Sequence, residues 1–170
     1  MNVGVIPARL HSTRFPRKIL APINEKPMVV HVYEKALQAE SLDDVIIAID
    51  SDETAEALKP FKVNTVMTFS DHKSGTDRVA QVVEELEADV VVNIQGDEPL
   101  VDHRQLDILC GAFNDDSVQI ATLAIKKVTP DDLRNPNRIK IVLDKNRDAL
   151  YFSRSAIPSA INTIESLDFY

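Results

Sequence analysis

The sequence predicts an α/β fold, with a mostly parallel β-sheet that carries helices on both faces. Short, almost entirely apolar segments alternate along the chain with longer segments in which apolar residues recur at helical spacing. The apolar segments lack polar alternation, which is typical of parallel strands buried on both faces. We therefore expect right-handed crossovers, and a ligand site beyond the carboxyl ends of the strands.

Six apolar segments have the composition of buried strands. Each is short and rich in aliphatic residues, and most contain several Val or Ile residues. We expect Pro7 to end the first of them, because proline cannot donate a hydrogen bond to a strand ladder. The predicted strands cover residues 3–6, 45–49, 63–67, 90–94, 119–125 and 138–143.

Four segments between these strands favour helices. In residues 27–39, Met28, Val32 and Ala36 recur at helical spacing and form one apolar stripe. The other predicted helices cover residues 52–59, 76–86 and 105–113. Residues 50–52 supply a cap for the helix at 52–59, and Ser74 with Asp77 forms a capping box for the next.

The bulk composition limits the classes of function. A chain of 170 residues with 44% hydrophobic residues predicts one domain with a packed core. Its formal net charge of -8 argues against surfaces that bind nucleic acid or anionic lipid, since both need clustered Lys and Arg. No segment has the length of a membrane span or the pattern of a signal peptide, and the single cysteine, Cys110, allows no internal disulfide. We therefore expect a cytoplasmic protein without nucleic-acid or membrane partners.

The loop after the first predicted strand concentrates positive charge. Residues 7–18 read PARLHSTRFPRK and hold four Arg and Lys residues, whereas the first acidic residue of the chain is Glu25. Like charges held this close repel each other unless a polyanion lies among them, and Arg and Lys are the usual ligands of phosphate oxygens. The loop therefore predicts a polyphosphate site. The alternative is a solvated loop whose cations pair with acidic groups elsewhere on the surface.

Two common nucleotide motifs are missing from the sequence. No Gly-x-x-x-x-Gly-Lys-Ser/Thr pattern occurs, which excludes a Walker A loop. The region of the first strand holds only Gly4, which excludes a glycine-rich dinucleotide fingerprint.

A carboxylate pair follows the fourth predicted strand, in the sequence QGDEP at residues 95–99. A carboxylate that leaves a strand on a Gly turn can reach over the edge of the sheet toward a ligand. Mg²⁺ takes one or two carboxylates together with phosphate oxygens, so Asp97 or Glu98 is a candidate Mg²⁺ ligand. The same residues are also ordinary turn composition.

Residues 70–78, with the sequence SDHKSGTDR, follow the third predicted strand and open a helix. A helix N-terminus attracts anions, and Arg78 would lie on the first turn of this helix. A capping box alone explains the same residues. His72 is left without a role, and His31 is expected to be structural or exposed.

In combination and in this order, these segments resemble the sugar-acid cytidylyltransferases, and within them the enzymes that act on 3-deoxy-manno-octulosonate (Kdo). The resemblance runs from Met1 to about Pro158. The matching pieces are residues 6–9, 12–16, 18, 26–28, 30–32, 71–72, 74–78, 92–99, 121–124, 135–137, 149–154 and 157–158.

The resemblance implies a fold and a reaction. The fold would be a Rossmann-like, GT-A-like nucleotidyltransferase sheet. The reaction would transfer a cytidylyl group from CTP to a sugar acid, Kdo or a close relative, with Mg²⁺ as cofactor and pyrophosphate as the second product. The family works in the cytoplasm in lipopolysaccharide precursor synthesis, usually as a homodimer.

The resemblance also implies roles for individual residues. The catalytic positions match Lys18, Arg9 and Asp97, and Asp97 matches the Mg²⁺ ligand. The nucleotide-binding positions match Arg9, Ser12, Arg14, Lys18, Ser74, Arg78 and Gln95. The positions directed toward the sugar acid match Gln95 and Arg154.

The sequence departs from the family pattern at several positions. Arg17 and Ile19 stand where the family usually has Gly and Pro, and Ser159 stands where Trp is common. Family members continue well beyond Tyr170, and that remainder carries a second metal-binding aspartate. We therefore expect one nucleotidyltransferase domain over residues 1–170 that lacks the C-terminal part of the family fold.

Two other functions stay open. The chain could be a fragment that binds CTP without turning it over. It could also be a metal-dependent glycosyltransferase, which shares the sheet and the metal carboxylate; its diphosphate donor needs fewer cations than residues 7–18 supply. The sequence leaves open whether the sugar acid is Kdo or an amino-substituted relative.

Overall fold

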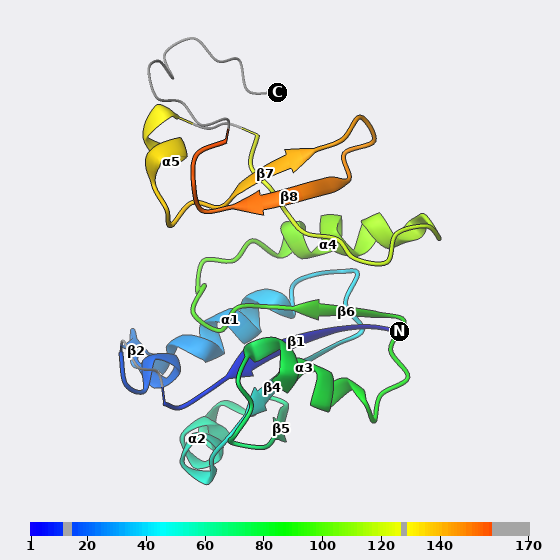
Figure 1. Cartoon of the computed structure of the whole chain (residues 1–170). Coiled ribbons are helices and arrows are strands. Elements are labelled where there is room, and N and C mark those ends of the chain that lie inside the picture. Colours follow the sequence, from blue (N-terminus) through cyan, green and yellow to red (C-terminus); the bar gives the residue numbers. More distant parts are fainter. Residues whose placement is uncertain (12–14, 127–128, 158–170) are drawn as a thin grey trace. The chain divides into compact units, whose positions relative to one another are not determined.

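The computed structural model describes residues 1–11, 15–126 and 129–157 of the chain (Figure 1). The chain divides into two compact units, Met1–Ala121 and Thr122–Tyr170. The first unit contains a four-stranded sheet with its helices, and the second contains an antiparallel strand pair. That both units form one functional domain stays a prediction.

The sheet of the first unit is parallel throughout and has the strand order β5-β4-β1-β6. Its strands are β1 (Asn2–Ala8), β4 (Asp44–Ile49), β5 (Thr65–Met67) and β6 (Val90–Asn93). The chain builds outward from β1 through β4 to β5, and then returns to place β6 on the other side of β1. This confirms the predicted parallel sheet, and it puts the reversal of strand order between β1 and β6.

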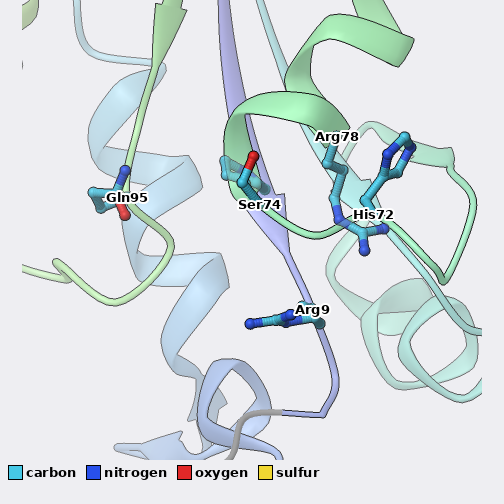
Figure 2. Close-up of a pocket in the computed structure, with 7 residues that line it drawn as sticks. Arg9, His72, Ser74, Arg78 and Gln95 are labelled. Atoms are coloured by element: carbon cyan, nitrogen blue, oxygen red, sulfur yellow. The ribbon is translucent and has the colours of Figure 1, made fainter.

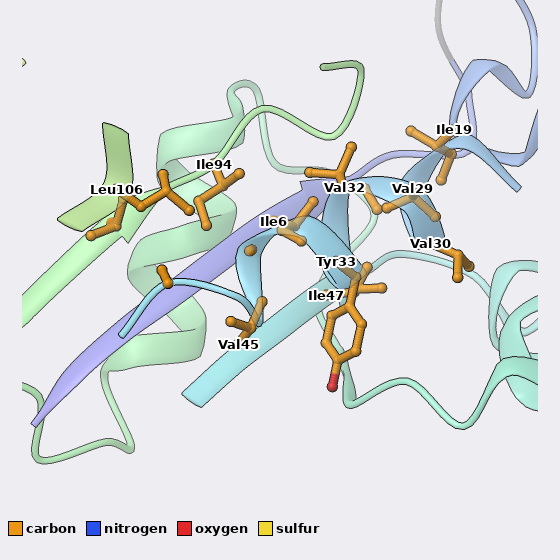
Figure 3. Close-up of a cluster of buried hydrophobic side chains, with 14 of the residues drawn as sticks. Ile6, Ile19, Val29, Val30, Val32, Tyr33, Val45, Ile47, Ile94 and Leu106 are labelled. Atoms are coloured by element: carbon orange, nitrogen blue, oxygen red, sulfur yellow. The ribbon is translucent and has the colours of Figure 1, made fainter. Parts of the chain in front are cut away.

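Helices cover both faces of this sheet, as predicted (Figure 1). The helices of the unit are α1 (Met28–Ala36), α2 (Asp52–Leu58), α3 (Gly75–Val83) and α4 (His103–Gly111). Val32 of α1 and Leu106 of α4 belong to the same buried cluster as Ile6 (Figure 3). Val79 of α3 belongs to the cluster on the opposite face, with Val5. Because neighbouring residues of β1 are buried on opposite faces, the strand is apolar without interruption.

Pro7 does not end the first strand, and that prediction was wrong. β1 continues through Pro7, which lies opposite Ala48, to Ala8. The carbonyl of Val5 accepts a hydrogen bond from Ile94 N–H on the β6 side at 2.9 Å, and the strand period of two directs Pro7 to that side as well. Pairing with β6 ends at Val5, so the missing N–H of the proline removes no ladder hydrogen bond.

The predicted caps of α2 and α3 are confirmed. Ser51 accepts a hydrogen bond from the backbone N–H of Thr54, and Ser74 forms a reciprocal capping box with Asp77. Three short 3₁₀ turns, η1 (Lys18–Leu20), η2 (Lys59–Phe61) and η3 (Ala112–Asn114), accompany these helices. A small hairpin of β2 (Pro22–Ile23) and β3 (Lys26–Pro27) precedes α1.

In the second unit, α5 (Pro130–Arg134) precedes the antiparallel pair β7 (Lys140–Leu143) and β8 (Ala149–Ser153). The strand predicted at residues 138–143 is confirmed in shorter form. The strand predicted at residues 119–125 is wrong, because no described strand pairs with this segment and its β-branched residues are not buried. Ile120 is 91% exposed and Ile125 is 72% exposed. Apolar residues favour a strand only where a neighbour is available for pairing.

A buried lysine holds the second unit together. The Nζ atom of Lys140 donates hydrogen bonds to the carbonyl oxygens of Asn135 at 3.0 Å, Arg138 at 2.8 Å and Arg154 at 2.7 Å. The residue is only 8% exposed, and the hydrogen bonds compensate the cost of burying the ammonium group. Lys140 therefore joins the loop before β7 to the turn that follows β8.

We expect Lys140→Met to lower the free energy of unfolding by about 3 kcal/mol, because the methionine fills the space of the stem but leaves three carbonyl oxygens without their donor. Lys145→Met is the matched control at an exposed site, where the change should stay within about 0.5 kcal/mol. Urea denaturation of both variants and the parent protein measures the difference. Equal stability of the two variants would contradict this role of the ammonium group.

Candidate functional site

A pocket of about 140 Å³ opens at the carboxyl edge of the sheet, where the strand order reverses between β1 and β6 (Figure 2). The end of β1, the first turn of α3 and the segment after β6 meet there, although they lie far apart in the sequence. The lining residues are Pro7, Arg9, His72, Ser74, Gly75, Arg78 and Gln95. This is the place where open α/β sheets bind ligands, and four of the predicted site residues gather at it.

The first turn of α3 lies close against β1. The side chain of Ser74 accepts a hydrogen bond from Asp77 N–H at 3.1 Å, and the Asp77 carboxylate accepts one from Ser74 N–H at 3.1 Å. A methyl group on Gly75 would come within 3.2 Å of the Pro7 ring, so only a small residue allows this approach. The capping hydroxyl acts as an acceptor, and its own proton can be donated to a ligand.

Arg78 is buried at the base of the pocket. It is 1% exposed, its Nη2 lies 3.2 Å from Asp50 Oδ2, and its Nη1 donates to the hydroxyl of Thr68. Burial lowers the pKa of the Arg78 guanidinium, the carboxylate of Asp50 acts in the opposite direction, and the positive charge of Arg9 lowers it further. Arg78 therefore belongs to a paired network beneath the pocket as well as to its wall.

His72 has a fixed orientation at the pocket. Its Nε2 lies 2.6 Å from Oε1 of Gln81, an oxygen that also accepts a hydrogen bond from Phe69 N–H at 2.9 Å. Since an amide oxygen only accepts, Nε2 of His72 donates this hydrogen bond. Figure 2 shows the ring beside Arg78.

Asp97 follows β6 on the predicted glycine turn, which Glu98 N–H closes on Gln95 O at 3.3 Å. A methyl group on Gly96 would lie 3.3 Å from the carbonyl oxygen of Pro7, so the turn requires glycine at this close approach to β1. The Asp97 carboxylate accepts a hydrogen bond from Nζ of Lys18 at 2.5 Å, and both side chains are partly exposed. The predicted metal ligand and the predicted triphosphate ligand are therefore paired with each other.

Two cations of the basic loop have acidic partners on other parts of the chain. Arg17 pairs with Glu53 of α2 at 2.7 Å, and Lys18 pairs with Asp97. This part of the loop thus has the surface pairing that was the alternative to a polyphosphate site. Arg9 is exposed and forms no ion pair within the described part of the chain.

Two predicted nucleotide ligands, Ser12 and Arg14, lie outside the described residues. Their roles stay predictions.

Arg154 belongs to the second unit, where it joins two pieces of the family pattern. Its Nη1 donates to the carbonyl oxygen of Pro136 at 3.0 Å, which links the turn after β8 to the loop before β7. The predicted role of Arg154 toward the sugar acid stays a prediction.

Within the described ranges, no three His, Cys, Asp or Glu side chains gather in a way that could hold a metal ion. The helices of the described ranges include none that is both long and apolar enough to cross a bilayer.

The sequence assigned Asp50 only to a helix cap, and it left Thr68 and His72 without a role. Asp50 and Thr68 both follow directly after the last residue of a strand, β4 and β5 respectively. The rule that placed Asp97 at a strand end could have identified both of them. Nothing in the sequence indicated that they would meet Arg78, because that contact depends on the order of the strands.

The strand order and the pocket at its reversal define an open α/β fold with a ligand site at the edge of its sheet. The sequence profile of the family described as cytidylyltransferase matches residues 3–168, and the chain belongs to that family.

Curated relatives support the predicted resemblance. The chain is 49% identical over 160 residues to a 3-deoxy-manno-octulosonate cytidylyltransferase of Syntrophobacter fumaroxidans, a match that covers 92% of the chain and 64% of the relative. It is 44% identical over 157 residues to the enzyme of the same name from Geobacter metallireducens, with 92% of the chain and 62% of the relative covered. The chain thus spans less than two-thirds of the length of these relatives.

A solved structure gives the same result for the fold. The structure of CMP:2-keto-3-deoxy-manno-octonic acid synthetase complexed with CTP matches with a TM-score of 0.88 at 41% identity, over 97% of this chain and 68% of that one. The predicted nucleotidyltransferase fold and the resemblance to Kdo cytidylyltransferases are confirmed.

The departure from the family pattern at Arg17 lowers the stability of the fold by a measurable amount. Arg17 adopts the left-handed conformation with φ 57°, which explains the glycine that the resemblance places there. We expect Arg17→Gly to be more stable than Arg17→Ala by about 1 kcal/mol, since both lose the pair with Glu53 and only glycine relieves the backbone. Thermal unfolding of both variants tests this. An alanine variant as stable as the glycine variant would contradict it.

Proposed function

We propose that the chain supplies the nucleotide site of an enzyme that transfers the cytidylyl group of CTP to Kdo or a close relative, with release of pyrophosphate. The observation that carries the proposal is that three groups follow two adjacent strands, β1 and β6, at their carboxyl ends. Arg9 comes from the end of β1, Lys18 from the basic loop and Asp97 from the turn after β6. The names of the relatives, and the CTP bound to the related synthetase, identify the substrates.

The reaction mainly requires neutralisation of the negative charge on the phosphates. The anomeric hydroxyl of the sugar acid attacks the α-phosphorus, the bond to the bridging oxygen breaks, pyrophosphate leaves and the hydroxyl loses its proton. Negative charge grows on the leaving group, and preorganised cations stabilise it. Arg9, Arg14 and Lys18 would bind the triphosphate oxygens, while Ser12, Ser74, Arg78 and Gln95 would hold the rest of the nucleotide.

Lys18 and Asp97 would exchange partners when the nucleotide binds. The side chains are 40% and 43% exposed, and an ion pair at that exposure contributes only about 0–1 kcal/mol. Opening it therefore costs little compared with charge-assisted hydrogen bonds from Lys18 to a triphosphate. The pair keeps both groups beside each other before ligand arrives.

Mg²⁺ fits the donor set at Asp97. Mg²⁺ binds through one or two carboxylates together with substrate phosphates and water, so a single carboxylate is sufficient when the nucleotide supplies the other oxygens. When bound, the cation would neutralise phosphate oxygens and orient the leaving group. Asp97 would hold it from the turn after β6.

Gln95 and Arg154 stay the candidate ligands of the sugar acid by resemblance, because a guanidinium suits a carboxylate. We further propose that the complete enzyme is a cytoplasmic homodimer of lipopolysaccharide precursor synthesis. A second candidate is CTP binding without turnover.

A paired assay separates the two functions. Isothermal titration measures CTP binding with Mg²⁺, and a pyrophosphate assay with Kdo measures turnover. Binding together with release supports the enzyme. Binding without release selects the binding module, and the lack of both would exclude the two proposals.

We expect Lys18→Ala to weaken CTP binding at least about tenfold, and to lower the free energy of unfolding by at most about 1 kcal/mol, because its ion pair is exposed. Lys59→Ala is the matched control, since Lys59 is also an exposed lysine in an ion pair, with Glu56 at 3.4 Å. Titration and urea denaturation give the two numbers. A Lys18 variant that binds CTP as the parent does would refute the role.

We expect Asp97→Asn to keep the fold and to remove the Mg²⁺ dependence of CTP binding, since the amide keeps the shape of the carboxylate but loses its charge. Asp131→Asn, at an exposed aspartate paired with Arg134, is the control. The readout is the ratio of CTP affinities with and without Mg²⁺. The proposal fails if the Asp97→Asn variant keeps the parent ratio.

A further inference from the structure

The buried Arg78–Asp50 pair reaches the base of the basic loop. Asp50 contacts Arg78 through Oδ2, and its Oδ1 accepts a hydrogen bond from the backbone N–H of Leu10 at 3.0 Å. The carbonyl of Leu10 in turn accepts one from Arg17 N–H at 3.1 Å. Leu10 and Arg17 therefore form a neck that is flanked by two of the triphosphate candidates, Arg9 and Lys18, and Asp50 holds this neck.

The carboxylate connects elements that are far apart in the sequence. Asp50 follows β4, Thr68 follows β5 and also donates to Ile49 O at 2.7 Å, and Arg78 lies on the first turn of α3. The side chains of Asp50 and Arg78 are 6% and 2% exposed. A pair buried this deeply is strongly directional and is costly to break, so it fixes geometry in a way that the exposed Lys18–Asp97 pair does not.

The network also bears on the charge of the pocket. Arg9 and Arg78 line the same pocket from different parts of the chain (Figure 2). Their positive charges repel each other. The Asp50 carboxylate neutralises the charge of Arg78, which is the buried arginine of this pair. It thereby allows Arg9 to lie exposed on the pocket wall, where an anionic ligand can reach it.

We propose that Asp50 is a positioning residue for the triphosphate. Its carboxylate, paired with Arg78, accepts the hydrogen bond of Leu10 N–H and so holds in place Arg9, which precedes Leu10, and Lys18, which follows Arg17. This rests on the proposed function, because it assigns to Asp50 the placement of the cations that would bind CTP. Asp50 itself contacts neither substrate nor metal.

The test compares CTP with CMP, which has the same base and sugar but lacks the β- and γ-phosphates. A displaced basic loop weakens the triphosphate contacts and leaves the others, so Asp50→Ala should lower CTP affinity about tenfold or more and change CMP affinity much less. Asp50→Asn keeps an oxygen acceptor for Leu10 N–H and should recover part of the CTP affinity. Thr68→Val, which removes another partner of Arg78 but not the neck, should leave the CTP-to-CMP ratio at the parent value.

A merely structural role for Asp50 predicts another outcome. CTP and CMP affinities would then fall together with stability in all three variants, and this result would overturn the proposal. If Asp50→Ala does not fold, amide hydrogen exchange in the parent protein and in Asp50→Asn decides. We expect the Leu10 and Arg17 amides to be protected in the parent, and fast exchange at Leu10 would overturn the hydrogen bond. A parent protein that binds no CTP but keeps this protection would refute the proposed function and leave the neck in place.

Discussion

The parallel pairing of β1 with β4 on one side and with β6 on the other is the constraint on which the site depends. β4 and β5 lie on one side of the central strand β1, and β6 lies on the other, so the strand order reverses at β1. At this reversal no crossover helix covers the edge where β1 and β6 end. The residues after these strands then face the same space. Pro7 continues β1 to this edge, and Gly75 and Gly96 allow α3 and the turn after β6 to approach it closely.

The electrostatics of the site follow from local pairing within an acidic chain. A net charge of -8 supplies carboxylates for the cations that gather at the sheet edge, and the pairs differ in burial. Arg17–Glu53 and Lys18–Asp97 lie at the surface, where water and salt screen them. Arg78–Asp50 is buried and hydrogen-bonded on both sides. Arg9, exposed at the pocket wall, carries positive charge that a ligand can neutralise.

The sequence predicted the parts of the fold that local rules govern. Apolar segments gave the parallel strands, and Ser51 and Ser74 gave the helix starts, because both signals act over a few residues. The strand at residues 119–125 failed because a strand needs a neighbour, which no local pattern contains. The role of Asp50 was not predicted for the same reason, because its partners Leu10 and Arg78 lie 40 and 28 residues away along the chain. The resemblance to the family assigned roles to Arg9, Lys18 and Asp97. It could not show that Lys18 and Asp97 pair with each other.

The difference in burial between the ion pairs divides the site into a part that is fixed and a part that can change partners. Breaking a buried pair by removing one member costs about 3–5 kcal/mol, whereas an exposed pair contributes about 1 kcal/mol or less. Nucleotide binding can therefore open Lys18–Asp97 without disturbing Arg78–Asp50. If the buried pair held the ligand-binding cation instead, each binding event would have to desolvate and separate it, and affinity would fall by that cost. Because the buried pair holds the neck of the loop and the pair that opens is exposed, the site avoids this conflict.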